Sequence, residues 1–204
     1  DERSWVVFES GPFGATYAHA LGIRPHVDRA NPILALIGSP TELTKLQSDR
    51  LESQSGVDLI TVDDPASDVS QLLSRLRASA EIGKTVIGIR TTSRDGSAPD
   101  PLHASQMLTL IIDLAVECAD SMQLDGIYAS GGDVAFAVLD ALGARGYEVE
   151  NEVVPLAVSG KLVGGPHDGL GFATKGGLVG DADAAVECIN QLRSRIRQSE
   201  PRIV

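Results

Sequence analysis

The stretch IYASGGDVAFA, residues 127–137, has the pattern of a buried strand that ends in a glycine turn and opens directly into a helix. Its first residues are apolar, and the residues after the Gly131-Gly132 pair place apolar side chains at helical spacing. Two other stretches, FESGPFGATYA at 8–18 and ALIGSPTELT at 35–44, have the same pattern. Repeated strand, turn and helix units are typical of a parallel α/β sheet.

Short runs rich in Val, Ile and Leu alternate with longer amphipathic stretches along the chain. This alternation predicts an α/β fold, in which a mostly parallel, Rossmann-like sheet carries helices on both faces. The predicted strands are 5–8, 33–37, 58–62, 85–89 and 126–129. The predicted helices are 41–53, 66–80, 105–122, 134–142 and 182–197.

The pattern changes after Gly143. Segments 148–154 and 156–163 have extended character and are separated by Pro155, and the glycine cluster GGPHDGLGFATKGGLVG follows at 164–180. A backbone so rich in glycine is expected to bend sharply or to approach a ligand closely. The polar segment RTTSRDGSAPDP at 90–101 predicts either a plain exposed loop or a mobile flap over a site.

Composition excludes several classes of function. A chain of 204 residues is long enough for one domain with its own core, and its formal net charge of -11 disfavours nucleic acid as a partner. No uninterrupted apolar run approaches the roughly 18 residues of a membrane span, so no membrane association is expected. Cys118 and Cys188 lie far apart in helix-like patterns, which predicts reduced core residues and a cytoplasmic protein.

The glycine turns are candidate anion sites, because helix N-termini and the carboxyl ends of parallel strands share one edge of a sheet. We expect the Gly131-Gly132 turn to form half of such a site and the stretch from Lys175 to Gly180 to form the other half. Lys175 could supply a point charge there, or it could be an ordinary solvated surface lysine. No Walker A motif and no complete GxGxxG fingerprint is present, which disfavours a dehydrogenase.

Other polar residues leave alternatives open. Asp133 could cap a helix that begins at Val134, or it could orient Mg²⁺ or the ribose hydroxyls of a nucleotide. The four histidines show no metal-ligand spacing, so no metal site is predicted from them. Only His167, beside Asp168 in the glycine cluster, is worth testing as a functional histidine.

Three segments together resemble a known family: GSPTELTKLQ at 38–47, SGGDVAFAVLDALG at 130–143 and GGPHDGLGFATKGGLVGDADA at 164–184. In order and spacing they are similar to the nucleotide-binding domain of the four-carbon acid sugar kinases. The resemblance covers most of the chain. It implies a nucleotide-binding domain over 31–204, preceded at 1–30 by a segment like the one that closes the family's N-terminal domain.

Members of this family transfer the γ-phosphate of ATP to a hydroxyl of a four-carbon sugar acid, such as a threonate, erythronate or oxo-tetronate. The resemblance therefore implies ATP and Mg²⁺ as cofactors. The residues that it implies for nucleotide binding are Ser39, Gly131, Gly132, Asp133, Val134, Lys175, Gly176, Gly177 and Gly180. The sequence departs from the family pattern at Val134, where a Thr is usual, at Val179, where a Phe is usual, and at Pro40-Thr41, where a more polar pair is usual.

The Asp-Asp-x-Thr-Gly-Ala motif of the family's N-terminal, sugar-binding domain does not occur in this sequence. We therefore expect the sugar acid to bind through a domain outside this chain, and the catalytic base is not predicted. The chain alone is expected to bind nucleotide with little turnover. The alternative is a non-catalytic nucleotide-sensing or interaction module of the same fold, which the Val134 substitution favours. Whether the domain forms a homodimer is left open.

Overall fold

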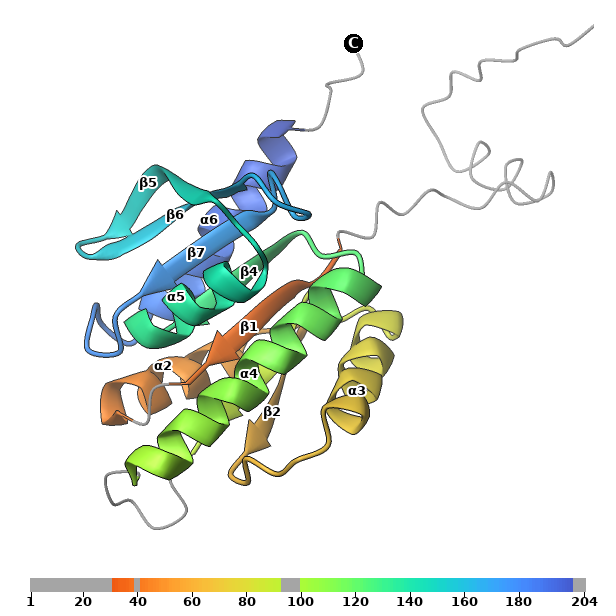
Figure 1. Cartoon of the computed structure of the whole chain (residues 1–204). Helices are drawn as coiled ribbons and strands as arrows, with labels where there is room; N and C mark the ends of the chain where they lie inside the picture. The colour runs from red at the N-terminus through yellow and green to blue at the C-terminus, as the bar shows by residue number, and fades with distance from the viewer. Residues whose placement is uncertain (1–30, 39–40, 93–99, 200–204) are drawn as a thin grey trace, which may run out of the picture.

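The computed structural model describes residues 31–38, 41–92 and 100–199 (Figure 1). Several predicted features lie outside the described residues: the segment 1–30 with its predicted strand at 5–8, Ser39, and most of the polar segment 90–101.

One sheet of seven strands organises the described part of the chain, in the order β2-β3-β1-β4-β7-β6-β5. The strands β2, β3, β1, β4 and β7 pair in parallel, whereas β6 is antiparallel to both β7 and β5. The prediction of a mostly parallel α/β sheet is confirmed. The strand bounds are β1 (Ile33–Ile37), β2 (Val57–Val62), β3 (Val86–Thr91), β4 (Gly126–Ser130), β5 (Gly146–Val154), β6 (Ala157–Val163) and β7 (Gly171–Lys175).

Helices cover both faces of this sheet, as predicted (Figure 1). Strand β1 shows why, because all five of its residues are buried and successive side chains point to opposite faces. Leu34 and Leu36 pack in the core under α3, α4 and α5, whereas Ile33 and Ile37 pack in the core under α2 and α6. The helix bounds are α2 (Glu42–Glu52), α3 (Val69–Glu81), α4 (Pro101–Ser121), α5 (Gly132–Ala141) and α6 (Ala184–Ser199).

The predicted elements inside the described ranges are all present, with ends displaced by up to four residues. One strand was not predicted. Strand β7 has only five residues, GFATK, and it lies inside the glycine cluster that the sequence indicates as a region of sharp bends. It nevertheless occupies an interior position of the sheet, between β4 and β6. Because β7 joins β6 to β4, the sequence prediction without β7 could not place the antiparallel β5-β6 pair in the sheet.

Helix α4 corrects the expectation that nothing in the chain resembles a membrane span. By length and composition α4 could cross a membrane, although core helices of soluble proteins pass the same test. Its residues Leu110, Ile111 and Leu114 are buried, and the helix contacts α3, α5 and β1. This packing assigns α4 to the core of the domain.

Candidate functional site

The carboxyl ends of β1, β4 and β7 lie side by side at one edge of the sheet (Figure 1). In the register of the sheet, Ile37 is opposite Ser130, and Ser130 is opposite Lys175. The contacts continue past the strand ends: Gly38 N donates to Ser130 O at 3.4 Å, and Gly131 N donates to Lys175 O at 2.9 Å. The two glycine turns are therefore neighbours, joined by a backbone hydrogen bond.

The first turn of α5 presents backbone donors at this edge. Gly131, the N-cap residue, has a φ of 113° and provides no side-chain cap. Ala135 N donates to Gly131 O, so the N–H groups of Gly132, Asp133 and Val134 precede the first intrahelical bond. A Cβ atom at Gly132 would meet nothing within 4 Å, so the space beside Gly132 is open. Such a helix start favours an anion.

The loop between β7 and α6 forms the other side of the site. Gly180 has a φ of 77°, and a Cβ atom there would lie 2.4 Å from the Cβ of Ala184. Only glycine fits this position without strain. The loop is held on one side by α2, because Thr44 Oγ1 donates to Gly177 O at 2.9 Å.

Lys175 lies underneath this loop and not on the surface. Its exposed fraction is 2%, and its ammonium donates to Gly176 O at 2.9 Å. Burial lowers the pKa of Lys175 from its ordinary value of 10.5. The interpretation of Lys175 as a solvated surface lysine is wrong, because β7 is an interior strand and its last side chain points into the α6 side of the sheet.

Taken together, the edge combines N–H groups at the start of α5 that have no acceptor among the described residues, glycines at both turns, and a buried lysine beneath the adjacent loop. Backbone N–H groups that converge in this way can bind a phosphate without positive charge on the domain as a whole. The chemistry available here is the binding of an anion.

Comparison with known protein families matches residues 34–185 to the family described as the nucleotide-binding C-terminal domain. A D-erythronate kinase from Heliobacterium modesticaldum is 34% identical over 95% of this chain. The chain belongs to the four-carbon acid sugar kinase family. Within that family it is a nucleotide-binding C-terminal domain, as its three sequence motifs indicated.

Other relatives in the family agree with this assignment. A D-threonate kinase from Salmonella typhimurium is 27% identical over 73% of this chain. The chain covers 49% of the D-erythronate kinase and 40% of this D-threonate kinase. It therefore spans half or less of the length of these sugar acid kinases.

Solved structures show the same fold. A Bordetella bronchiseptica protein, described as a domain of unknown function with bound citrate and as a domain-swapped dimer, matches 80% of this chain with a TM-score of 0.68 and 26% identity. This chain covers 41% of that protein. A Haemophilus influenzae protein matches 87% of this chain and is covered over 45% of its own length, with a TM-score of 0.65. At 16% identity, this second likeness concerns the fold alone.

Eight of the site residues that the family resemblance implies lie in the described part of the chain, and the structure brings these eight together. Four of them form the start of α5 and four lie at the end of β7 and in the following loop: Gly131, Gly132, Asp133, Val134, Lys175, Gly176, Gly177 and Gly180. Ser39 lies outside the described residues. The role of these residues in nucleotide binding stays a prediction.

The structure shows where the side chains of two α5 residues, Asp133 and Val134, lie. Asp133 does not precede the helix as a cap, because α5 begins at Gly132, and Asp133 is exposed in the first turn. The side chain of Val134 is buried, and its Cγ2 lies 2.6 Å from where a Cβ atom of Gly38 would be. A nucleotide could therefore meet Val134 only through its backbone N–H.

Sequence reasoning missed three polar residues of the site, Thr41, Thr44 and Gln47, which bind the loop after β7. They lie inside the first family motif, but their partners are more than 130 positions further along the chain. Their spacing of three residues could have predicted that they share one side of α2, and so that this side packs against polar groups.

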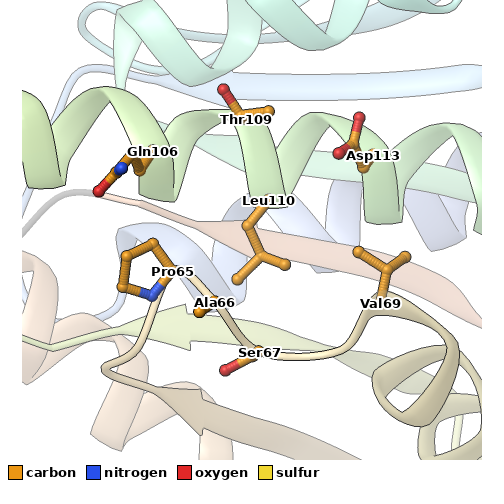
Figure 2. Close-up of a pocket in the computed structure, with 8 residues that line it drawn as sticks. All are labelled: Pro65, Ala66, Ser67, Val69, Gln106, Thr109, Leu110 and Asp113. Atoms are coloured by element: carbon orange, nitrogen blue, oxygen red, sulfur yellow. The ribbon is translucent and has the colours of Figure 1, made fainter.

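A separate cavity of about 390 Å³ lies between the loop that follows β2 and helix α4 (Figure 2). Ser67 of the loop and Gln106, Thr109 and Asp113 of α4 contribute its polar side chains, and none of its lining residues is basic. This cavity does not match the anion chemistry of the glycine turns. Its lining consists of Pro65, Ala66, Ser67, Val69, Gln106, Thr109, Leu110 and Asp113.

The histidine and the cysteines singled out in the sequence do not add donors to this site. His167 precedes β7, whereas the glycine loop follows it, and His167 Nε2 lies 3.1 Å from Asp120 Oδ1. Cys118 and Cys188 are free and buried, which confirms their interpretation as reduced core residues. Within the described ranges, no three His, Cys, Asp or Glu side chains form a group that could hold a metal ion.

Proposed function

We propose that this domain binds ATP and is the ATP-binding part of a kinase that phosphorylates a four-carbon sugar acid of the threonate, erythronate or oxo-tetronate type. One observation carries the proposal: Gly131 N donates to Lys175 O at 2.9 Å, which makes the two glycine turns walls of a single site. The names of the D-erythronate and D-threonate kinases support the substrate class.

In this proposal the triphosphate lies between the start of α5 and the loop after β7. The N–H groups of Gly132 and Asp133 donate to phosphate oxygens, as at other helix N-termini. Lys175 does not contact the phosphate in this proposal. Its buried ammonium donates to Gly176 O and adds positive potential to the loop. Its role is electrostatic support.

The residues present also fit Mg²⁺ as a companion of ATP. Magnesium is usually held by one or two carboxylates together with substrate phosphates, and not by a cage of protein ligands. Asp133 is exposed in the first turn of α5, where it would supply one such carboxylate. When bound, the ion would neutralise charge on the phosphates.

The acceptor hydroxyl must be placed in line with the γ-phosphate for transfer to occur. We propose that a sequence outside this chain, corresponding to the other half of the related kinases, binds the sugar acid and supplies the base. The chain by itself then binds ATP with little phosphoryl transfer.

A thermal shift assay tests nucleotide binding. Mg-ATP at about 100 times its Kd should stabilise the folded chain by about 2.7 kcal/mol, because a ligand that binds only the folded state raises its stability by mass action. NAD at the same concentration serves as the control and should give a much smaller shift. Equal shifts with both ligands, or none with Mg-ATP, would contradict the proposal.

The burial of Val134 favours a second candidate, a non-catalytic nucleotide-sensing or interaction module. The family's usual Thr would offer a hydroxyl, whereas Val134 offers only an apolar side chain packed against Gly38. Both candidates bind ATP. They differ once a sugar-binding half is present: the kinase would then phosphorylate a four-carbon acid, and the module would not.

A further inference from the structure

Helix α2 carries a row of polar residues that faces the protein interior. Thr41 caps the helix, and Thr44 and Gln47 follow at intervals of three residues, which places them along one side. Thr44 and Gln47 are only 2% and 1% exposed. Polar groups are buried at a cost unless they are hydrogen-bonded, so their partners matter.

Those partners are the carbonyl groups of the loop after β7. Thr41 Oγ1 and Thr44 Oγ1 both donate to Gly177 O, at 3.0 and 2.9 Å. Gln47 Nε2 donates to Val179 O at 3.0 Å and to Asp181 O at 2.6 Å. Three carbonyl oxygens of the loop are thus fixed toward α2.

The orientation of these carbonyls sets the orientation of the N–H groups. In a planar trans peptide the C=O of one residue and the N–H of the next point in opposite directions. Because Gly177 O and Val179 O point toward α2, the N–H groups of Leu178 and Gly180 point away from it. These two groups donate to no acceptor within the described part of the chain.

Helix α5 lies on the opposite face of the sheet from α2. The N–H groups of Leu178 and Gly180 thus point away from α2, and the Gly131-Gly132 turn that begins α5 is not on the α2 side of the sheet. If the carbonyls lost their donors, a peptide could rotate and direct its N–H inward, which would remove a donor from the anion site.

We propose that Thr44 and Gln47 are positioning residues for phosphate binding, which hold the loop peptides so that the N–H groups of Leu178 and Gly180 face the nucleotide. This inference rests on the proposed function, since it assigns a cause to the shape of the same site. Neither side chain touches the ligand in this account, because both are buried behind the loop.

Calorimetric titration of the 204-residue chain with Mg-ATP at 25 °C tests the proposal. Thr44→Val keeps the shape of the side chain and removes its hydroxyl. It is made together with Thr41→Val, because the hydroxyls of Thr41 and Thr44 both donate to Gly177 O and either one alone would keep that carbonyl bonded. Gln47→Met removes both amide donors. Each variant should bind Mg-ATP about tenfold more weakly, the equivalent of one or two lost hydrogen bonds. Thr44→Ser, made with the same Thr41→Val change, restores the hydroxyl and should stay within about threefold of the wild-type affinity.

Ser48→Ala is the matched control. Ser48 is also buried on α2, at 2% exposure, but its hydroxyl donates to Lys45 O within the same helix and does not reach the loop. This variant should lose some thermal stability and keep its affinity for Mg-ATP. A purely structural role for Thr44 would give the same result as Ser48→Ala.

The outcomes separate the two proposals. Wild-type chain that fails to bind Mg-ATP overturns the proposed function and this inference together. Wild-type chain that binds, with folded Thr41→Val/Thr44→Val and Gln47→Met binding as tightly, overturns the inference alone. Should Gln47→Met not fold, Thr41→Val/Thr44→Val and its serine counterpart decide the question by themselves.

Discussion

A Gly132→Val variant is expected to lose the stabilisation by Mg-ATP while it keeps nearly the stability of the wild-type chain without ligand. Gly132 lies within α5, and a Cβ atom there would meet nothing within 4 Å, so the fold tolerates a side chain. The unliganded change should stay within about 0.5 kcal/mol. The added isopropyl group would occupy the open space beside Gly132, next to the first-turn N–H groups to which we propose a phosphate binds.

Asp140→Val provides the control for this variant. Asp140 is exposed near the other end of α5, so the substitution introduces the same side chain into the same helix, far from the glycine turns. Mg-ATP should still stabilise Asp140→Val by the wild-type amount in a thermal shift assay. An undiminished shift in Gly132→Val would exclude the start of α5 from the site.

Lys175→Ala is expected to lower the free energy of unfolding by about 2 kcal/mol or more, because it leaves a cavity where a buried aliphatic stem packed. Lys175→Met retains most of the volume and should cost less than about 1.5 kcal/mol. Urea denaturation monitored by circular dichroism measures both values. A surface lysine would give a change within about 0.5 kcal/mol for either substitution, which would contradict the burial of Lys175.

The pH dependence of the same variants gives a further readout. Burial lowers the pKa of Lys175 below 10.5, so between the lowered value and 10.5 the unfolded chain binds more protons than the folded chain. The free energy of unfolding contributed by Lys175 therefore rises with pH in that window. Lys175→Met should lack this rise. Tyr128, whose pKa burial raises, is present in both proteins. Cys188 interacts electrostatically with Lys175, so the comparison is made in a Cys188→Ala background.

The fold was predictable where local pattern and final packing agree. Strand β1 and helix α5 with its preceding glycine turn follow from apolar periodicity and turn residues alone. Strand β7 did not follow, because five residues between glycines carry too little periodicity to distinguish a strand from a bend. Its place in the sheet is decided by pairing with β4 and β6, which are distant in sequence.

The candidate site was predictable in its glycines and not in its supporting polar groups. Gly131 and Gly180 adopt left-handed φ values, which is what their residue type permits. The burial of Lys175 runs against the usual exposure of lysine and depends on the interior position of β7. The contacts of Thr44 and Gln47 depend on how α2 packs against a loop more than 130 residues later.

Titration of ¹⁵N-labelled chain with Mg-ATP, followed by amide chemical shifts, tests most directly whether the two glycine turns form one nucleotide site. The expected result is that the amide resonances of Gly132 and Asp133 shift together with those of Leu178 and Gly180, and that all four give a single Kd. Shifts at one turn alone, or shifts gathered around the cavity between the loop that follows β2 and helix α4, would contradict the account.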